Sequence, residues 1–298
     1  MKKIIILVVV SLLLVSCSLP FTINWNSPQS TAGSSLPTDQ LVVPPTEAPV
    51  VATTQPAIPT LAGTQLNLGG VSMVLPACLA ANPTGAIVPA QPYDPNNGPM
   101  EYFPQHRAIS FPGYPLAGKV FEPVIRVYPV AEFTAMNNVI TERVNAMITL
   151  INNQPVLPAA DIPLLPMFNA AQVFRAQVKF LAFQNGQGIR FLTEYAQFYD
   201  PVNNHDLFYT YQGITSDGKY WVSAILPVNA AFLQADYNIP QVPADGIAAP
   251  DPGSATFSAD METYMTAMIA KLNSTADNVF TPGLDCLDQY IQSLQIGD

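Results

Sequence analysis

The strongest β-strand signal in the chain is Val173–Phe198, VFRAQVKFLAFQNGQGIRFLTEYAQF, and the predicted fold is built around it. Its first half alternates apolar and polar side chains, which is the period of a β-strand with one buried face. The turn residues of Asn185–Gly188 predict a reversal of the chain, after which Ile189–Phe198 returns as a second strand. If Asn185 pairs with Gly188, Lys179 lies opposite Glu194, which is a favourable cross-strand charge pair. We therefore predict an antiparallel hairpin in this register.

A second hairpin follows in the sequence. Two strand-like runs, Asp206–Thr215 and Lys219–Leu226, flank Ser216-Asp217-Gly218, and Asp-Gly favours a type I′ turn. Pairing residue 216 with residue 219 places Ile214 beside Trp221 on one face of the hairpin. On the other face it places Tyr209 and Tyr211 near Leu226 and Ala224. The two hairpins together predict a four-strand antiparallel meander.

The flanking sequence adds strands before the meander and helices on both sides of it. Short strands are predicted at Gly70–Leu75, Arg107–Phe111 and Val124–Tyr128, with a turn-rich stretch over Pro76–Gln105. Apolar residues three and four positions apart predict helices over Glu132–Asn152 and over Ser258–Ser274, the second capped by Ser258. A short last helix opens at Pro282. The helical stripes are Phe133, Met136, Ile140, Val144, Met147, Ile148 and Ile151 in the first helix, Met261, Tyr264, Met265, Met268, Ile269 and Leu272 in the second, and Cys286, Tyr290, Ile291 and Leu294 in the last.

These elements predict an α+β fold, in which helices pack on an antiparallel sheet made of the meander and the N-terminal strands. The order of strands, helix, meander and closing helices resembles that of the PsbP/Mog1-like sandwich. In that family a helix interrupts the sheet and another closes it. The resemblance implies a layered α+β sandwich for the folded part of this chain.

The N-terminus carries the features of an export signal. Lys2 and Lys3 precede an apolar run over Ile4–Val15, and the small residue Ser16 stands before Cys17. The run is shorter than the roughly 20 residues that a membrane-spanning helix needs. Leu14-Val15-Ser16-Cys17 resembles the lipobox of bacterial lipoproteins, which implies lipidation of Cys17 and cleavage before it. The implied location is extracytoplasmic, with a lipid anchor in the membrane; the alternative is an ordinary secretory signal with a cysteine there by chance.

The chain divides into a signal peptide (residues 1–16), a lipidated cysteine with a tether (17–64) and one α+β domain (65–298). Prolines recur throughout the tether. Each proline lacks a backbone N–H donor and has a fixed φ, which disfavours helices and sheet ladders. We therefore expect an extended, disordered linker there. The prolines are Pro20, Pro28, Pro37, Pro44, Pro45, Pro49, Pro56 and Pro59.

Cysteine usage agrees with export. Once Cys17 is assigned to the lipid, Cys78 and Cys286 remain, and two cysteines in an oxidising compartment predict one disulfide. The alternative is a pair of buried free thiols. Two distant cysteines and two histidines show no metal-ligand spacing, so the sequence indicates neither a metal site nor a cofactor.

The charge of the chain restricts its partners. The formal net charge is −10, and removal of Lys2 and Lys3 takes it to about −12. The remaining lysines and arginines are scattered and form no basic stripe, which argues against nucleic acid as a partner. The expected partners are the membrane, through the lipid, and an unknown protein or saccharide.

Few residues of the domain suggest a catalytic or binding function. No Gly-x-Ser-x-Gly elbow, His-Glu-x-x-His motif or P-loop occurs, and no catalytic residue is assigned. The densest polar cluster is the loop from Asp200 to Asp206, with Asn203 and His205 inside it. Tyr209 and Tyr211 form a tyrosine-rich strand beside it, suited to sugar or peptide contacts. The alternative is a loop that caps backbone groups and tyrosines that fill the core.

These features favour a non-enzymatic, lipid-anchored envelope domain that binds a partner or ligand from a flexible stalk. One alternative is an envelope hydrolase acting on wall polymers through the Asp200–Asp206 loop. Another is the substrate-binding lipoprotein of a transporter, although such receptors usually have two α/β lobes.

Overall fold

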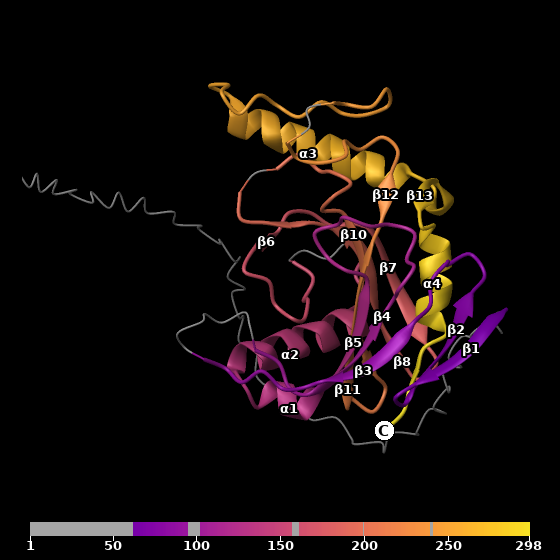
Figure 1. Ribbon diagram of the computed structural model, residues 1–298. Coiled ribbons are helices and arrows are strands. Elements are labelled where there is room, and N and C mark those ends of the chain that lie inside the picture. The colour runs from indigo at the N-terminus through magenta and orange to yellow at the C-terminus, as the bar shows by residue number, and fades with distance from the viewer. Residues whose placement is uncertain (1–61, 95–101, 157–160, 199, 239–240) are drawn as a thin grey trace, which may run out of the picture. The chain divides into compact units, whose positions relative to one another are not determined.

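The computed structural model describes residues 62–298, apart from 95–101, 157–160, 199 and 239–240 (Figure 1). The signal segment, Cys17 and the tether up to residue 61 lie outside the described residues. Residues 95–101 of the predicted turn-rich stretch also lie outside them. Those sequence-based predictions therefore stay predictions.

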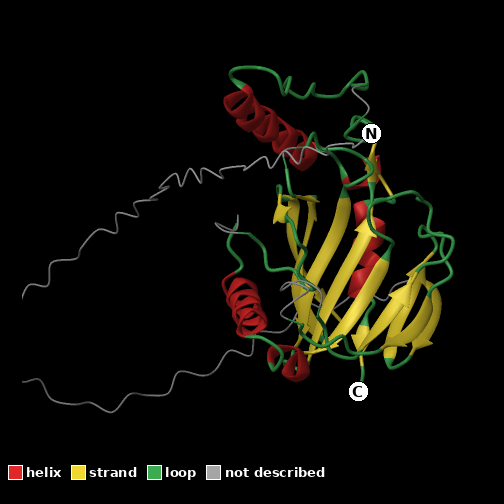
Figure 2. Cartoon of the chain, turned by 60° about the vertical axis from the view of Figure 1, so that its left-hand side comes forward, coloured by secondary structure: helices red, strands yellow, loops and turns green. Residues whose placement is uncertain are grey.

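A seven-stranded antiparallel sheet forms the centre of the described chain (Figure 2). The predicted meander fills four neighbouring places in it, and the strands predicted near Arg107 and Val124 continue it on one side. The expected α+β class is thereby confirmed. From one edge to the other the strands are β3 (Thr84–Val88), β4 (His106–Ser110), β5 (Val124–Pro129), β11 (Tyr220–Pro227), β10 (Phe208–Thr215), β8 (Gly186–Thr193) and β7 (Ala176–Phe183).

Both faces of this sheet are covered (Figure 1). On the α2 face, α1 (Val130–Thr134) and α2 (Asn138–Asn153) pack against Tyr128, Phe191 and Trp221. On the α4 face, α3 (Phe257–Ser274), α4 (Leu284–Gln292) and the hairpin of β1 (Gly63–Leu68) and β2 (Val71–Pro76) share a larger core with Tyr209 and Tyr211. The remaining short elements are β14 (Gln295–Ile296) beside β2, β6 (Ala171–Gln172) beside β9 (Tyr195–Ala196), β12 (Asn229–Ala230) beside β13 (Phe280–Thr281), and the 3-10 helix η1 (Asp277–Val279).

The predicted register of the second hairpin is confirmed. Ile214 pairs with Trp221, Tyr209 with Leu226 and Tyr211 with Ala224. The turn is held by the Asp217 carboxylate, which accepts hydrogen bonds from the Thr215 hydroxyl (2.6 Å) and the Lys219 amide (3.0 Å). Gly218 has a φ of 73°, which glycine adopts without strain.

The predicted register of the first hairpin is wrong. Phe183 pairs with Gly186, so Gln184 and Asn185 make the turn, and Lys179 lies opposite Arg190 rather than Glu194. Gly186 is a strand residue at a position where a side chain would not fit: a Cβ would lie 2.2 Å from the Phe183 ring and 2.4 Å from the Ile214 carbonyl oxygen.

The helix predicted over Glu132–Asn152 is two helices. The chain leaves the helical conformation before Asn137, whose backbone is extended and whose side chain accepts a hydrogen bond from the Val139 amide at 2.8 Å. Asparagine is a strong N-cap, so α2 starts there. The predicted apolar stripe is buried apart from two residues: Met136 is partly buried and Ile148 is 38% exposed.

The N-terminal part of the domain holds two strands that the sequence did not indicate. β1 begins at Gly63 and pairs with β2, which corresponds to the strand predicted at Gly70–Leu75. β3 lies within the stretch predicted as turns, and it is an edge strand whose first four residues are exposed. Exposed strands lack the alternation of apolar side chains on which strand prediction depends.

The C-terminal helices agree with the prediction within a few residues. α3 begins at Phe257 after an N-cap at Thr256, where the sequence predicted a cap at Ser258. α4 begins at Leu284, shortly after Pro282, and buries Cys286. Cys286 forms a disulfide with Cys78, with Cα atoms 6.1 Å apart, which joins the turn after β2 to this helix. The structure therefore contains the predicted cysteine pair.

Candidate functional site

The four predicted loop residues lie in one polar cluster between β9 and β10. The Asn203 side chain donates to the Asp206 carboxylate at 2.9 Å, and its oxygen accepts from the amides of His205 (2.9 Å) and Asp206 (3.1 Å). The His205 ring contacts Asp206 at 2.7 Å. Burial raises the pKa of Asp200, with further contributions from the carboxylates of Asp206 and Asp236.

The hydrogen bonds of this cluster hold the backbone of the loop in place. Asn204 bonds to the backbone of Ala230 through both ends of its amide, at 2.8 and 3.0 Å. Within the described part of the chain, no serine, threonine or cysteine side chain hydrogen-bonds to His205, and no group of three or more potential metal ligands is found. The arrangement is that of a loop fastened at both ends.

Glu194 belongs to the same cluster, although the sequence predicted a cross-strand pair of Glu194 with Lys179. Its side chain is buried, with 2% exposure of the residue, and Oε1 accepts from the Asn203 amide at 2.9 Å. Burial raises its pKa well above the ordinary range, and the negative charges of Asp206 and Asp200 raise it further.

We expect Glu194→Gln to stabilise the protein increasingly as the pH rises from 4 towards 7. Well below the ordinary glutamate pKa of about 4.3, the folded and unfolded states both hold the proton, so the pKa difference does not affect stability. At higher pH the unfolded state releases the proton and the folded state keeps it, which costs up to about 1.4 kcal/mol per pH unit. Urea unfolding of both proteins at several pH values measures this difference. Glu262→Gln, at an exposed position of α3, is the matched control. A stability gain that does not change with pH would contradict the assignment.

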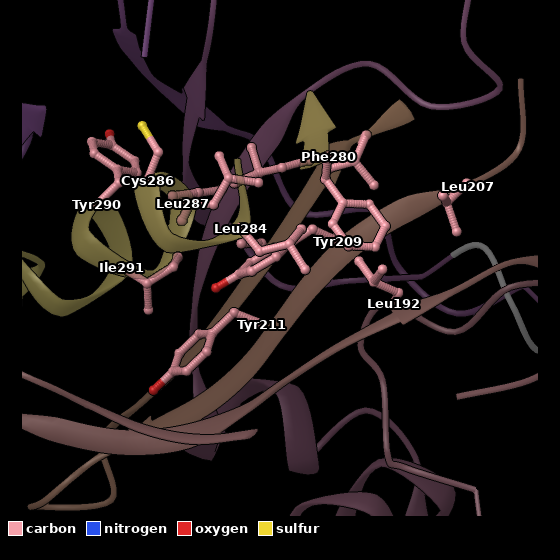
Figure 3. Close-up of a cluster of buried hydrophobic side chains, with 14 of the residues drawn as sticks. Leu192, Leu207, Tyr209, Tyr211, Phe280, Leu284, Cys286, Leu287, Tyr290 and Ile291 are labelled. Carbon is pink, nitrogen blue, oxygen red and sulfur yellow. The ribbon is translucent and has the colours of Figure 1, made fainter. Parts of the chain in front are cut away.

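The two predicted tyrosines do not join this cluster. Tyr209 and Tyr211 are fully buried on the α4 face, and Figure 3 shows them among the side chains of α4. The Tyr209 hydroxyl donates to Asp288 at 3.1 Å and the Tyr211 hydroxyl to the Leu181 carbonyl at 3.1 Å. Burial raises the pKa of both phenols well above the ordinary range. These side chains are core residues and are not available to a sugar or peptide.

A groove of about 670 Å³ lies on the α2 face, at the end of the sheet beyond α1 and α2. Its floor is made by side chains of β4, β5 and β11, namely Ser110, Val124, Arg126 and Ile225. Arg126 and Tyr128 are two positions apart in β5 and therefore point to the same face of the sheet. Small neighbours make room for the groove, because Arg126 pairs with Ala108 on β4 and with Ser223 on β11.

Aromatic side chains form one wall of the groove. Phe121 stacks on Phe168 with ring centroids 4.7 Å apart, and Phe208 packs edge-on against Phe121 at 5.2 Å. The loop between β4 and β5, which carries Phe121, continues the lining with residues between 111 and 118, and Tyr114 fixes this loop by donating to the Pro227 carbonyl at 2.8 Å.

The Asp200–Asp206 loop holds the loop between β4 and β5 in place. The Val120 amide donates to the His205 carbonyl at 3.1 Å, and the Lys119 ammonium donates to the Asn204 carbonyl. Lys119 also donates to the Asn229 side chain. The polar loop predicted as a ligand site is thus next to the groove and holds the segment that shapes it.

The sequence did not indicate the groove, because its lining comes from three segments that are far apart in the chain. These are residues 110–126, Pro166 with Phe168, and Ile225. One signal was present: Arg126 is a single charged residue within the strand Val-Ile-Arg-Val-Tyr-Pro, at a position that faces the helices. A charge inside a two-sided buried strand is costly unless it has a partner or a function.

No protein-family description, curated protein or solved structure matches this chain. The resemblance to the PsbP/Mog1-like sandwich therefore stays a prediction. The groove, with its one arginine and its aromatic wall, is the feature from which a function is argued.

Proposed function

We propose that this chain is a lipid-anchored, extracytoplasmic binding protein that holds a small ligand in the groove. The groove carries the proposal, since its volume of about 670 Å³ lies within the range of small-molecule sites. Its composition supports the same reading, because aromatic walls bury the body of a ligand and a few polar groups orient it. The backbone role of the Asp200–Asp206 cluster gives the hydrolase alternative less support.

The disulfide supports export. The Cys78–Cys286 bond is typical of proteins in oxidising compartments. Among the helices of the described residues, none has the length and apolar character needed to cross a bilayer. The proposed anchor is the acyl chains on Cys17, which contribute about 0.8 kcal/mol for each buried methylene.

We expect the full chain, expressed in a bacterium, to sediment with membranes and to incorporate labelled palmitate. Cys17→Ala should abolish the label, because the thioether requires the Cys17 thiol. Cys78→Ser is the matched control, since it removes another cysteine and should leave the label unchanged. A wild-type chain that carries no label would refute the anchor.

A further inference from the structure

We infer that the groove selects ligands bearing a carboxylate or phosphate group, which Arg126 binds, with an apolar or aromatic body against Phe121 and Phe168. This inference deepens the proposed function and rests on the groove being the ligand site. It starts from the state of Arg126, which is half-buried on the floor of the groove.

Arg126 has no partner in the part of the chain that the structure describes. There, Arg126 and Arg143 are the two basic residues without a hydrogen bond, ion pair or ring contact. The other basic residues bond to carboxylates or backbone, or lie over aromatic rings: Arg107, Lys119, Arg175, Lys179, Arg190, Lys219 and Lys271. In a chain with a formal charge of −10, a half-buried arginine left without a carboxylate is a conspicuous exception.

The neighbours of Arg126 in the sheet do not neutralise it. Ala108 and Ser223 flank it on the two adjacent strands, and neither carries charge. His106 is buried nearby, and both burial and the positive charge of Arg126 lower its pKa, so its ring is neutral at physiological pH. Glu122 lies on the exposed rim of the groove and forms no ion pair with Arg126 among the described contacts. The floor of the groove is therefore a positive site.

A guanidinium that is partly removed from water gains most from an oxyanion. Its planar fork donates two parallel hydrogen bonds to a carboxylate or phosphate, and such charge-assisted bonds are about twice as strong as neutral ones. Ser110, two positions along β4 from Ala108, adds a hydroxyl on the same side of the floor. The stacked pair Phe121–Phe168 stands beside this polar floor and offers an apolar surface to the rest of the ligand.

Ligand-observed fluorine NMR on the full chain in detergent tests this inference. The probes are para-fluorobenzoate and para-fluorophenyl phosphate, with para-fluorobenzyl alcohol as the neutral match and detergent alone as the background. Arg126→Met keeps the apolar stem and removes the charge. Arg143→Met removes a second unpartnered arginine that does not line the groove, so it controls for net charge. Ser110→Trp fills the floor.

We expect both oxyanion probes to bind, the tighter one identifying the preferred group, and Arg126→Met to weaken their binding at least about tenfold. Arg143→Met should leave both affinities unchanged, and the neutral probe should bind Arg126→Met and wild type alike, which also reports folding. If the neutral and anionic probes bind equally and Arg126→Met has no effect while Ser110→Trp blocks both, the groove is the ligand site but the oxyanion inference is wrong. If Ser110→Trp leaves the binding of every probe unchanged, or no probe binds, the groove proposal fails as well.

Discussion

Cys78→Ser is expected to lower the free energy of unfolding by about 5 kcal/mol. The disulfide to Cys286 joins residues separated by 208 positions, and closing so long a loop lowers the conformational entropy of the unfolded chain by an amount equivalent to about 5 kcal/mol. Cys78 is exposed, so the substitution itself disturbs little packing. Since a domain is typically stable by only 5–15 kcal/mol, this loss removes a large share of the total.

Urea unfolding, followed by tryptophan fluorescence, measures the effect. Wild type in the presence of a reductant should unfold at the same urea concentration as Cys78→Ser, and the reductant should not change the variant further. Cys17→Ser leaves the disulfide intact and serves as the control. Equal unfolding midpoints for wild type with and without reductant would show that the disulfide does not stabilise the domain.

Asp288→Leu is expected to cost about 3–5 kcal/mol, because it removes one of the two anions beside a buried arginine, the one that is itself buried. Asp288 is 3% exposed and Arg190 is 2% exposed. Arg190 Nε lies 3.3 Å from Asp288 Oδ1, an ion pair without the angle of a hydrogen bond, and Lys179 donates to Oδ2 at 2.8 Å. The remaining anion near Arg190 is Asp277, at 3.3 Å and partly exposed.

A double variant separates the charge from the packing. Asp288→Leu combined with Arg190→Met replaces the buried pair by apolar side chains, and we expect it to recover most of the lost stability. Asp285→Leu, at an exposed position on the same helix, should cost less than about 1 kcal/mol. A double variant as unstable as Asp288→Leu alone would mean that packing, and not the uncompensated charge, causes the loss. Urea unfolding at pH 7 provides all four values.

The ion pair between Arg190 and Asp288 explains why the first hairpin departs from the predicted register. The sequence favoured Lys179 opposite Glu194 as an attractive pair, yet Lys179 lies opposite another cation, Arg190. Both cations reach Asp288, which comes from α4, more than 90 positions later in the chain. Local pairing rules do not include a carboxylate from a distant helix, and the steric limits at Gly186 also arise from the fold around it.

The sequence also predicted the candidate site only in part. The sequence pointed to the polar loop, and the structure does bring Asp200, Asn203, His205 and Asp206 together, but their hydrogen bonds run to one another and to the backbone of the same loop. The tyrosines predicted beside them project to the α4 face and fill the core. The groove depends on small neighbours around Arg126, and neighbours across strands become known only with the strand order.

Local features therefore followed from the sequence alone: the alternation of the meander, the Asp217-Gly218 turn with Ile214 beside Trp221 and the apolar stripes of the helices. The pairing of the two domain cysteines followed from the cysteine count. Each of these depends on residues close in the chain or on a count of one residue type. Only the tertiary structure decided the register around Gly186, the burial of Glu194 and the groove over Arg126. The physical reason is that these features depend on steric and electrostatic contacts between segments far apart in sequence, and such contacts exist only once the sheet and its helices are assembled.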